Sequence, residues 1–127
     1  MNKILKYINY TLLLFCFLSC GQSDKYAGQY ISEDACDIKI SIDIIDKEYT
    51  YKISYDSTNN SGKIKIDSLT GDTYLEFKNL KSVSQDNPIS ALYENNSLII
   101  QNYGNALNNY THFKNCDLKY IRLIKDN

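Results

Sequence analysis

The chain has 127 residues, with 14 basic and 15 acidic side chains and a formal net charge of −1 at pH 7. This length suits a single domain. The balanced charge lacks the basic patch that nucleic-acid binding requires, so we exclude nucleic acid as a partner.

The first twenty residues have the order of a secretory signal peptide. Lys3 and Lys6 give a positive start, an apolar run covers 12–18, and Ser19 precedes Cys20. The run is roughly a dozen residues, short of the ~20 that span a bilayer. We therefore expect cleavage of residues 1–19 rather than a transmembrane helix.

A cysteine at the cleavage point resembles the lipobox of bacterial lipoproteins, over residues 1–21. The resemblance implies that Cys20 receives diacylglycerol on its sulfur and, after cleavage, a further acyl chain such as palmitate on its amine. Two or three acyl chains hold a protein on a membrane almost permanently. Gly21 resembles the outer-membrane sorting class, so the expected location is the bacterial cell envelope, at the outer membrane. The expected organisation is a signal peptide (1–19), a lipidated tether (20–26) and one β domain (27–127).

Two cysteines remain after the signal peptide and the lipid are accounted for. An even pair in an oxidising compartment favours a disulfide between Cys36 and Cys116. The bond would close a loop of about 80 residues, which the chain-entropy model values at about 4.5 kcal/mol. The alternative is a two-cysteine metal site, but no histidine lies nearby at ligand spacing. We expect the disulfide, no metal and no cofactor.

Apolar and polar residues alternate with period two almost throughout the remaining chain, which is typical of strands with one buried face. Polar composition predicts turns at 56–62 and 68–72 and loops at 81–88 and 102–115. Residues 94–96 are expected to form the turn of a hairpin. The expected strands are 27–32, 36–44, 49–55, 63–66, 73–78, 89–93, 97–101 and 118–124.

About eight short strands without a confident helix predict an all-β fold, either an antiparallel barrel or a sandwich. Gly28, Tyr30 and Arg122 resemble positions of lipocalin-like barrels, in which a Gly-x-aromatic start packs against a basic residue near the end. The resemblance implies a barrel, which we prefer to a sandwich. The segment 101–120 is also similar to small uncharacterised bacterial lipoproteins, and this likeness implies no activity.

Catalytic and metal-binding patterns are weak. His112 is the only histidine, and no nucleophile motif or carboxylate pair accompanies it, so we expect a surface histidine and no enzyme. Asp56, Thr58 and Asn60 alternate before Gly62, but the glycine stands one position late for a calcium loop. A polar turn is the expected structure there.

Tyrosines provide the candidate binding surface. Tyrosine offers a large contact area with a polar tip, and the side chains in question are Tyr49, Tyr51, Tyr55, Tyr103 and Tyr110. The alternative is that these rings form a barrel core. We expect a non-catalytic envelope protein that binds a small or apolar ligand or an envelope component. A structural or inhibitory protein that binds another protein through its outer surface is the alternative. A cavity of about 300 Å³ or more inside the barrel would favour the first function.

Overall fold

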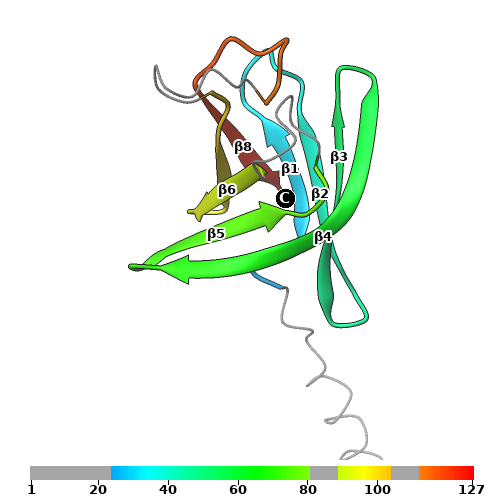
Figure 1. The fold of residues 1–127 in the computed structure, drawn as a ribbon, viewed down its shortest axis with the longest axis vertical. Coiled ribbons are helices and arrows are strands. Elements are labelled where there is room, and N and C mark those ends of the chain that lie inside the picture. The colour runs from blue at the N-terminus through cyan, green and yellow to red at the C-terminus, as the bar shows by residue number, and fades with distance from the viewer. Residues whose placement is uncertain (1–23, 81–88, 104–111) are drawn as a thin grey trace, which may run out of the picture.

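Eight antiparallel strands form a closed barrel in which each strand pairs with the next and the last pairs with the first (Figure 1). The computed structural model describes residues 24–80, 89–103 and 112–127. Among these residues there is no helix of the length and hydrophobicity that a membrane span requires. The strands are β1 (Gly28–Ser32), β2 (Lys39–Ile45), β3 (Glu48–Tyr55), β4 (Thr58–Leu69), β5 (Asp72–Phe77), β6 (Ile89–Glu94), β7 (Ser97–Gln101) and β8 (Tyr120–Asp126). The predicted all-β fold is confirmed, and the β1–β8 pairing makes it a barrel rather than a sandwich.

Two-residue turns connect four of the strand pairs. Both residues of each turn have positive φ, between 45° and 89°. Turns of this kind match the right-handed twist of the strands that they join. They are Asp46–Lys47, Asp56–Ser57, Thr70–Gly71 and Asn95–Asn96.

The long polar turn predicted over 56–62 is wrong. Only Asp56 and Ser57 turn, and β4 begins at Thr58. The first part of β4 pairs with β3, from Tyr55↔Thr58 to Thr50↔Lys63. Backbone hydrogen bonds along this ladder outweigh the turn preference of an Asn- and Ser-rich segment, because strand propensity depends strongly on context.

Side chains from all eight strands fill the barrel. The Tyr51 ring lies edge-on to Phe77, with centroids 5.1 Å apart, and its hydroxyl donates to the Lys78 carbonyl at 2.7 Å. Gly62 lies opposite Tyr51 on β4, where a Cβ would approach that carbonyl to 2.5 Å. The other large side chains that are fully buried are Tyr30, Ile38, Ile40, Ile42, Ile53, Leu75, Ile89, Leu98, Ile100 and Ile121.

Candidate functional site

The two ends of the barrel are built from different segments. The chain enters β1 at the end that carries turns 46–47, 70–71 and 95–96, which we call the N-terminal end. The opposite end, which we call the disulfide end, carries segments 33–38, 56–57, 78–80, 102–103 and 112–119.

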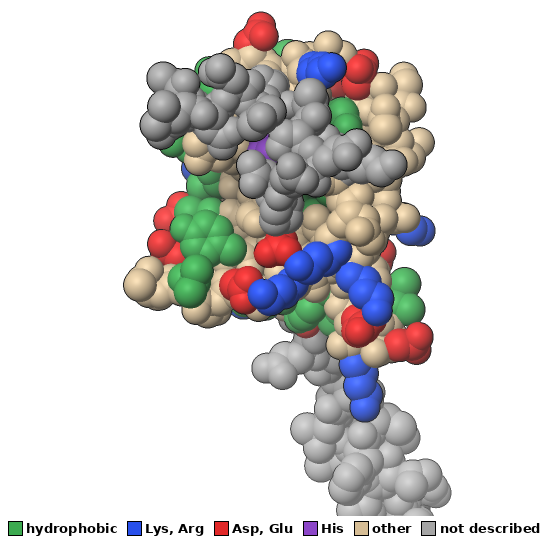
Figure 2. Space-filling view, viewed as in Figure 1, with side chains coloured by type: hydrophobic (Ala, Val, Ile, Leu, Met, Phe, Trp, Pro, Cys, Tyr) green, Lys and Arg blue, Asp and Glu red, His purple; other side chains and the backbone are tan. Residues whose placement is uncertain are grey.

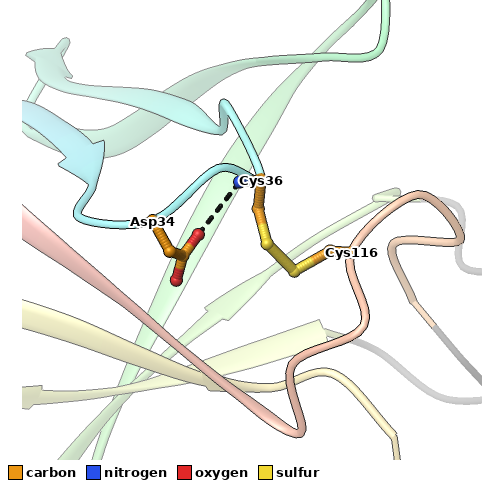
Figure 3. A group of neighbouring side chains, drawn as sticks. All are labelled: Asp34, Cys36 and Cys116. Atoms are coloured by element: carbon orange, nitrogen blue, oxygen red, sulfur yellow. Dashed lines mark hydrogen bonds between the residues drawn. A yellow bond between two sulfur atoms is a disulfide. The ribbon is translucent and has the colours of Figure 1, made fainter.

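A disulfide joins the loop before β2 to the loop before β8. The Sγ atoms of Cys36 and Cys116 are 1.95 Å apart, and the Cα atoms are 5.0 Å apart, which confirms the predicted pairing. Asp34 lies beside the bond, and its Oδ1 accepts a hydrogen bond from the Cys36 amide at 3.0 Å (Figure 3). These three side chains form a cluster of potential metal ligands. Because the two sulfurs are bonded to each other, the cluster offers no thiolate to a metal.

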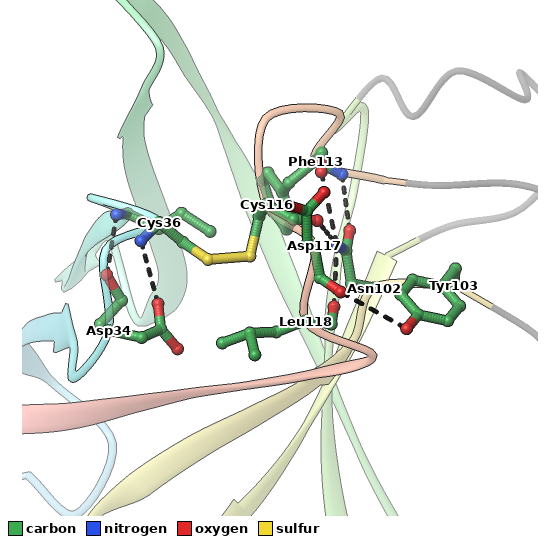
Figure 4. Close-up of a disulfide and its surroundings, with 10 residues drawn as sticks. Asp34, Cys36, Asn102, Tyr103, Phe113, Cys116, Asp117 and Leu118 are labelled. Carbon is green, nitrogen blue, oxygen red and sulfur yellow. Dashed lines mark hydrogen bonds between the residues drawn. A yellow bond between two sulfur atoms is a disulfide. The ribbon is translucent and has the colours of Figure 1, made fainter.

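Asn102 organises the rest of the disulfide end and is fully buried. Its Nδ2 lies 2.7, 3.0 and 3.3 Å from the carbonyl oxygens of Cys116, Leu118 and Phe113 (Figure 4). Its Oδ1 accepts the Phe113 amide at 2.7 Å. One side chain therefore pairs four backbone groups of segment 112–119. Sequence analysis placed this residue in an irregular loop and missed its role.

Phe113 closes the disulfide end. It is 2% exposed, and its ring lies edge-on to Tyr55 with centroids 4.8 Å apart. His112 precedes it and is half-buried, which corrects the expected surface histidine. Burial lowers the pKa of His112, which favours the neutral imidazole. Within the described part of the chain its Nδ1 has no hydrogen-bond partner.

Asp24 fixes the entering chain to the N-terminal end. Tyr49 donates its hydroxyl to Asp24 Oδ2 at 2.7 Å, and the amides of Tyr26 and Ala27 donate to Oδ1 at 2.9 and 3.1 Å. Burial raises the pKa of the Asp24 carboxyl, but these hydrogen bonds outweigh burial and lower the pKa overall. The hydrogen bond to Asp24 raises the pKa of Tyr49 to about 12.

Tyr26 closes the same end with two other rings. It meets Tyr49 and Tyr93 edge-on, with centroids 5.7 and 4.9 Å away. The Tyr30 hydroxyl donates to the Tyr26 carbonyl at 2.7 Å, and the Tyr93 hydroxyl donates to the Lys25 carbonyl at 3.0 Å. Residues that the sequence assigned to a flexible tether are thus packed onto the barrel.

The candidate tyrosines do not gather on one surface. Tyr49 lies at the N-terminal end, Tyr51 in the core and Tyr55 at the disulfide end, and burial raises the pKa of Tyr51 to about 12. Tyr103 is half-buried and donates its hydroxyl to the Asp117 carbonyl at 3.4 Å. Tyr110 lies outside the described residues.

The basic residue that packs against the Gly-x-aromatic start is Lys125. It pairs with Tyr30 across β1 and β8, and its Nζ lies 5.9 Å from the Tyr30 ring centroid. Arg122 instead extends outward, where its Nε lies 3.9 Å from a Glu33 carboxylate oxygen. The expected role of Arg122 is therefore wrong, because alternation along β8 turns residue 122 to the outside.

A groove of about 400 Å³ lies on the outer wall of β1–β4. Polar residues and Ile53 line it, and much of its exposed surface belongs to apolar atoms. Strand register places its side chains in two rows, with short serines between longer lysine, glutamine and asparagine side chains. The rows are Gln29, Ser41, Lys52 and Ser61, and Lys39, Ser54 and Asn59.

The groove differs in charge from the neighbouring wall. It contains two lysines and no carboxylate; in the described structure Lys52 has no ion pair, and Lys39 lies 4.0 Å from the exposed Asp37. On β3–β5, by contrast, lysines alternate with acidic partners, and Figure 2 shows such mixed charges on the face that β4 and β5 cross. The pairs are Lys63–Glu48 at 2.6 Å, Lys65–Asp67 at 3.2 Å and Lys78–Glu76. A carboxylate also borders the groove, because Ser41 Oγ donates to Asp43 Oδ2 at 3.4 Å. Lys52 is therefore the positive charge of the groove that has no carboxylate beside it in the described structure.

No protein-family model, no curated protein and no solved structure matches this chain.

Proposed function

We propose that the chain is a non-catalytic lipoprotein of the bacterial cell envelope, held at the outer membrane through lipid on Cys20, that binds an envelope component on its outer wall. The signal-like order of residues 1–20 supports the anchor. An oxidising compartment suits the Cys36–Cys116 disulfide. Binding is assigned to the outer wall because core side chains of the described residues fill the barrel, with Tyr26 packed at one end and Phe113 at the other.

The groove on the outer wall of β1–β4 is the feature that supports a binding role. The unpaired ammonium of Lys52 and the amide and hydroxyl groups around it suit a ligand that bears both anionic groups and hydroxyls. An acidic glycan of the envelope has this chemistry. The alternative is that a protein partner binds the same wall. The surface of that partner would need to be acidic.

The anchor is tested by the mass of the purified protein. We expect cleavage before Cys20 and the added mass of diacylglycerol and an acyl chain. The full chain should sediment with membranes after a high-salt wash, whereas the Cys20→Ala variant should not, because it lacks the lipid. An unmodified Cys20 in protein made by its native type of host would reject the anchor.

The groove is tested with oligogalacturonate as an acidic probe and maltooligosaccharide as a neutral one. We expect calorimetry to show binding of the acidic probe only. The Lys52→Gln variant should bind it about tenfold more weakly, because one charge-assisted hydrogen bond contributes at least ~1.5 kcal/mol. Lys65→Gln is the matched control, since Lys65 is outward-facing but paired with Asp67.

Equal losses in the two lysine variants would reject the groove as the site. Equal binding of the neutral probe would reject an anionic ligand. If neither sugar binds and a partner protein crosslinks to β1–β4 in cells, the alternative function is supported instead.

A further inference from the structure

Three aliphatic side chains stand out from two hairpins at the N-terminal end. Ile44 is 46% exposed, Ile45 is 55% exposed and Leu69 is 63% exposed. They are the most exposed aliphatic residues of the part of the chain that the structure describes. A soluble surface leaves single apolar residues exposed without consequence, but these three share one end of the barrel.

A hydrogen bond joins the β2–β3 hairpin to the entering chain, and the β4–β5 tip borders a cleft that the entering chain also lines. Ile44 pairs with Tyr49, whose hydroxyl binds Asp24. Leu69 pairs with Asp72, and Asp72 lines a cleft of about 420 Å³ together with Lys25. In Figure 1 the tip of the β2–β3 hairpin points downward, on the side from which the chain enters β1, and the tip of the β4–β5 hairpin projects to the left.

The anchor must be close to this end. Cys20 lies four residues before Asp24 in the sequence, and a chain of that length reaches at most about 14 Å. Because Asp24 is fixed by three hydrogen bonds, a lipid on Cys20 would hold the N-terminal end against the membrane surface. This step rests on the proposed anchor.

We infer that the tips of the β2–β3 and β4–β5 hairpins contact the lipid surface through Ile44, Ile45 and Leu69. Apolar side chains gain free energy on entering the interfacial region of a bilayer. The barrel then stands on its N-terminal end, with the disulfide end turned away from the membrane and the β1–β4 groove open on the side wall.

The charges at this end identify the kind of contact. Acidic residues outnumber lysines there, so attraction to anionic headgroups does not hold the barrel down. The acidic residues are Asp43, Asp46, Glu48, Asp72, Glu94 and Asp126, in addition to Asp24, and the lysines are Lys25, Lys47 and Lys125. Contact through the aliphatic side chains should therefore occur on zwitterionic lipid.

The absence of tryptophan from the sequence makes a site-specific test possible. The Ile45→Trp, Leu69→Trp and Leu118→Trp variants each carry one tryptophan, and Leu118, at the disulfide end, is a matched exposed control at 41%. Each lipidated full-length variant is reconstituted in phosphatidylcholine vesicles with or without brominated acyl chains. Since interfacial side chains sit only ~5–10 Å deep, bromines near the headgroup end of the acyl chain are used.

We expect brominated lipid to lower the emission of the Ile45→Trp and Leu69→Trp variants at least about twofold, as interfacial burial implies, and to leave Leu118→Trp unchanged. Equal quenching of all three, or of none, overturns the inference. The emission of the Ile45→Trp and Leu69→Trp variants is also measured in detergent micelles without lipid. If it changes with protein concentration there, and does not respond to brominated lipid in vesicles, a second copy of the chain covers the tips and the inference is overturned. The mass of the purified protein is measured first, to establish whether Cys20 is lipidated. A chain without lipid means that the proposed anchor fails and that this inference fails with it, whereas a lipidated chain without selective quenching rejects this inference alone.

Discussion

The Asn102→Ala variant is expected to lose about 3 kcal/mol of folding free energy. The substitution removes the side-chain partner of the Phe113 amide and of the Cys116 and Leu118 carbonyls, and a buried unsatisfied group costs ~1–3 kcal/mol. The Phe113 carbonyl keeps its hydrogen bond from the Cys116 amide at 3.1 Å. For a domain of this size the melting temperature should fall on the order of 15 °C. Thermal unfolding followed by far-ultraviolet circular dichroism measures the change.

Two further variants separate the hydrogen bonds from other effects. Asn102→Asp keeps the shape but directs carboxylate oxygen at carbonyl oxygens, so it should be at least as unstable as Asn102→Ala at pH 7. Gln101→Ala removes a neighbouring amide that is exposed and should cost less than about 0.5 kcal/mol. Similar melting temperatures for the Gln101 and Asn102 variants would show that Asn102 does not organise segment 112–119.

Removal of the disulfide is the second large effect. The Cys36→Ser/Cys116→Ser variant should lose up to about 4.5 kcal/mol, because the two cysteines are 80 residues apart and their bond restricts the unfolded chain. Urea unfolding of the two proteins measures the loss. The wild type should become less stable in dithiothreitol, whereas the double variant should not respond. A double variant as stable as the oxidised wild type would contradict the prediction.

The two effects should not add fully. Asn102 Nδ2 binds the Cys116 carbonyl at 2.7 Å, so both changes release the same segment of backbone. Neighbouring sites with shared partners commonly show coupling. We therefore expect the combined variant, if it folds, to lose less than the sum of the separate losses.

Local patterns in the sequence were sufficient to assign most of the strands. The alternation of Ile40 and Ile42 with polar neighbours placed them on the inner face of β2, where both are fully buried. The polar residues around Asn95 and Asn96 indicated a hairpin, and these two residues make its turn. Period-two alternation is a property of the backbone itself, so it can be read without knowledge of the partner strands.

Long-range contacts decided the features that local patterns missed. Thr58 to Gly62 have turn-forming composition, yet pairing with β3 draws them into β4. Asn102 has no local signature, because its four partners lie in segment 112–119. Tyr49 and Tyr55 share one face of β3 but contact opposite ends of the barrel, because a strand of eight residues spans the barrel's length.

The sequence alone determined an all-β domain with about eight strands, its inner faces and the pairing of Cys36 with Cys116, because alternation and cysteine number are local or compositional properties. That β8 meets β1, and that Lys125 rather than Arg122 lies against Tyr30, became evident only from the arrangement of the strands in space. The same arrangement packs Tyr26 at one end of the barrel and Phe113 at the other. These features depend on which strand edges and loops meet in space, and the hydrophobic pattern along the chain does not specify which of them meet.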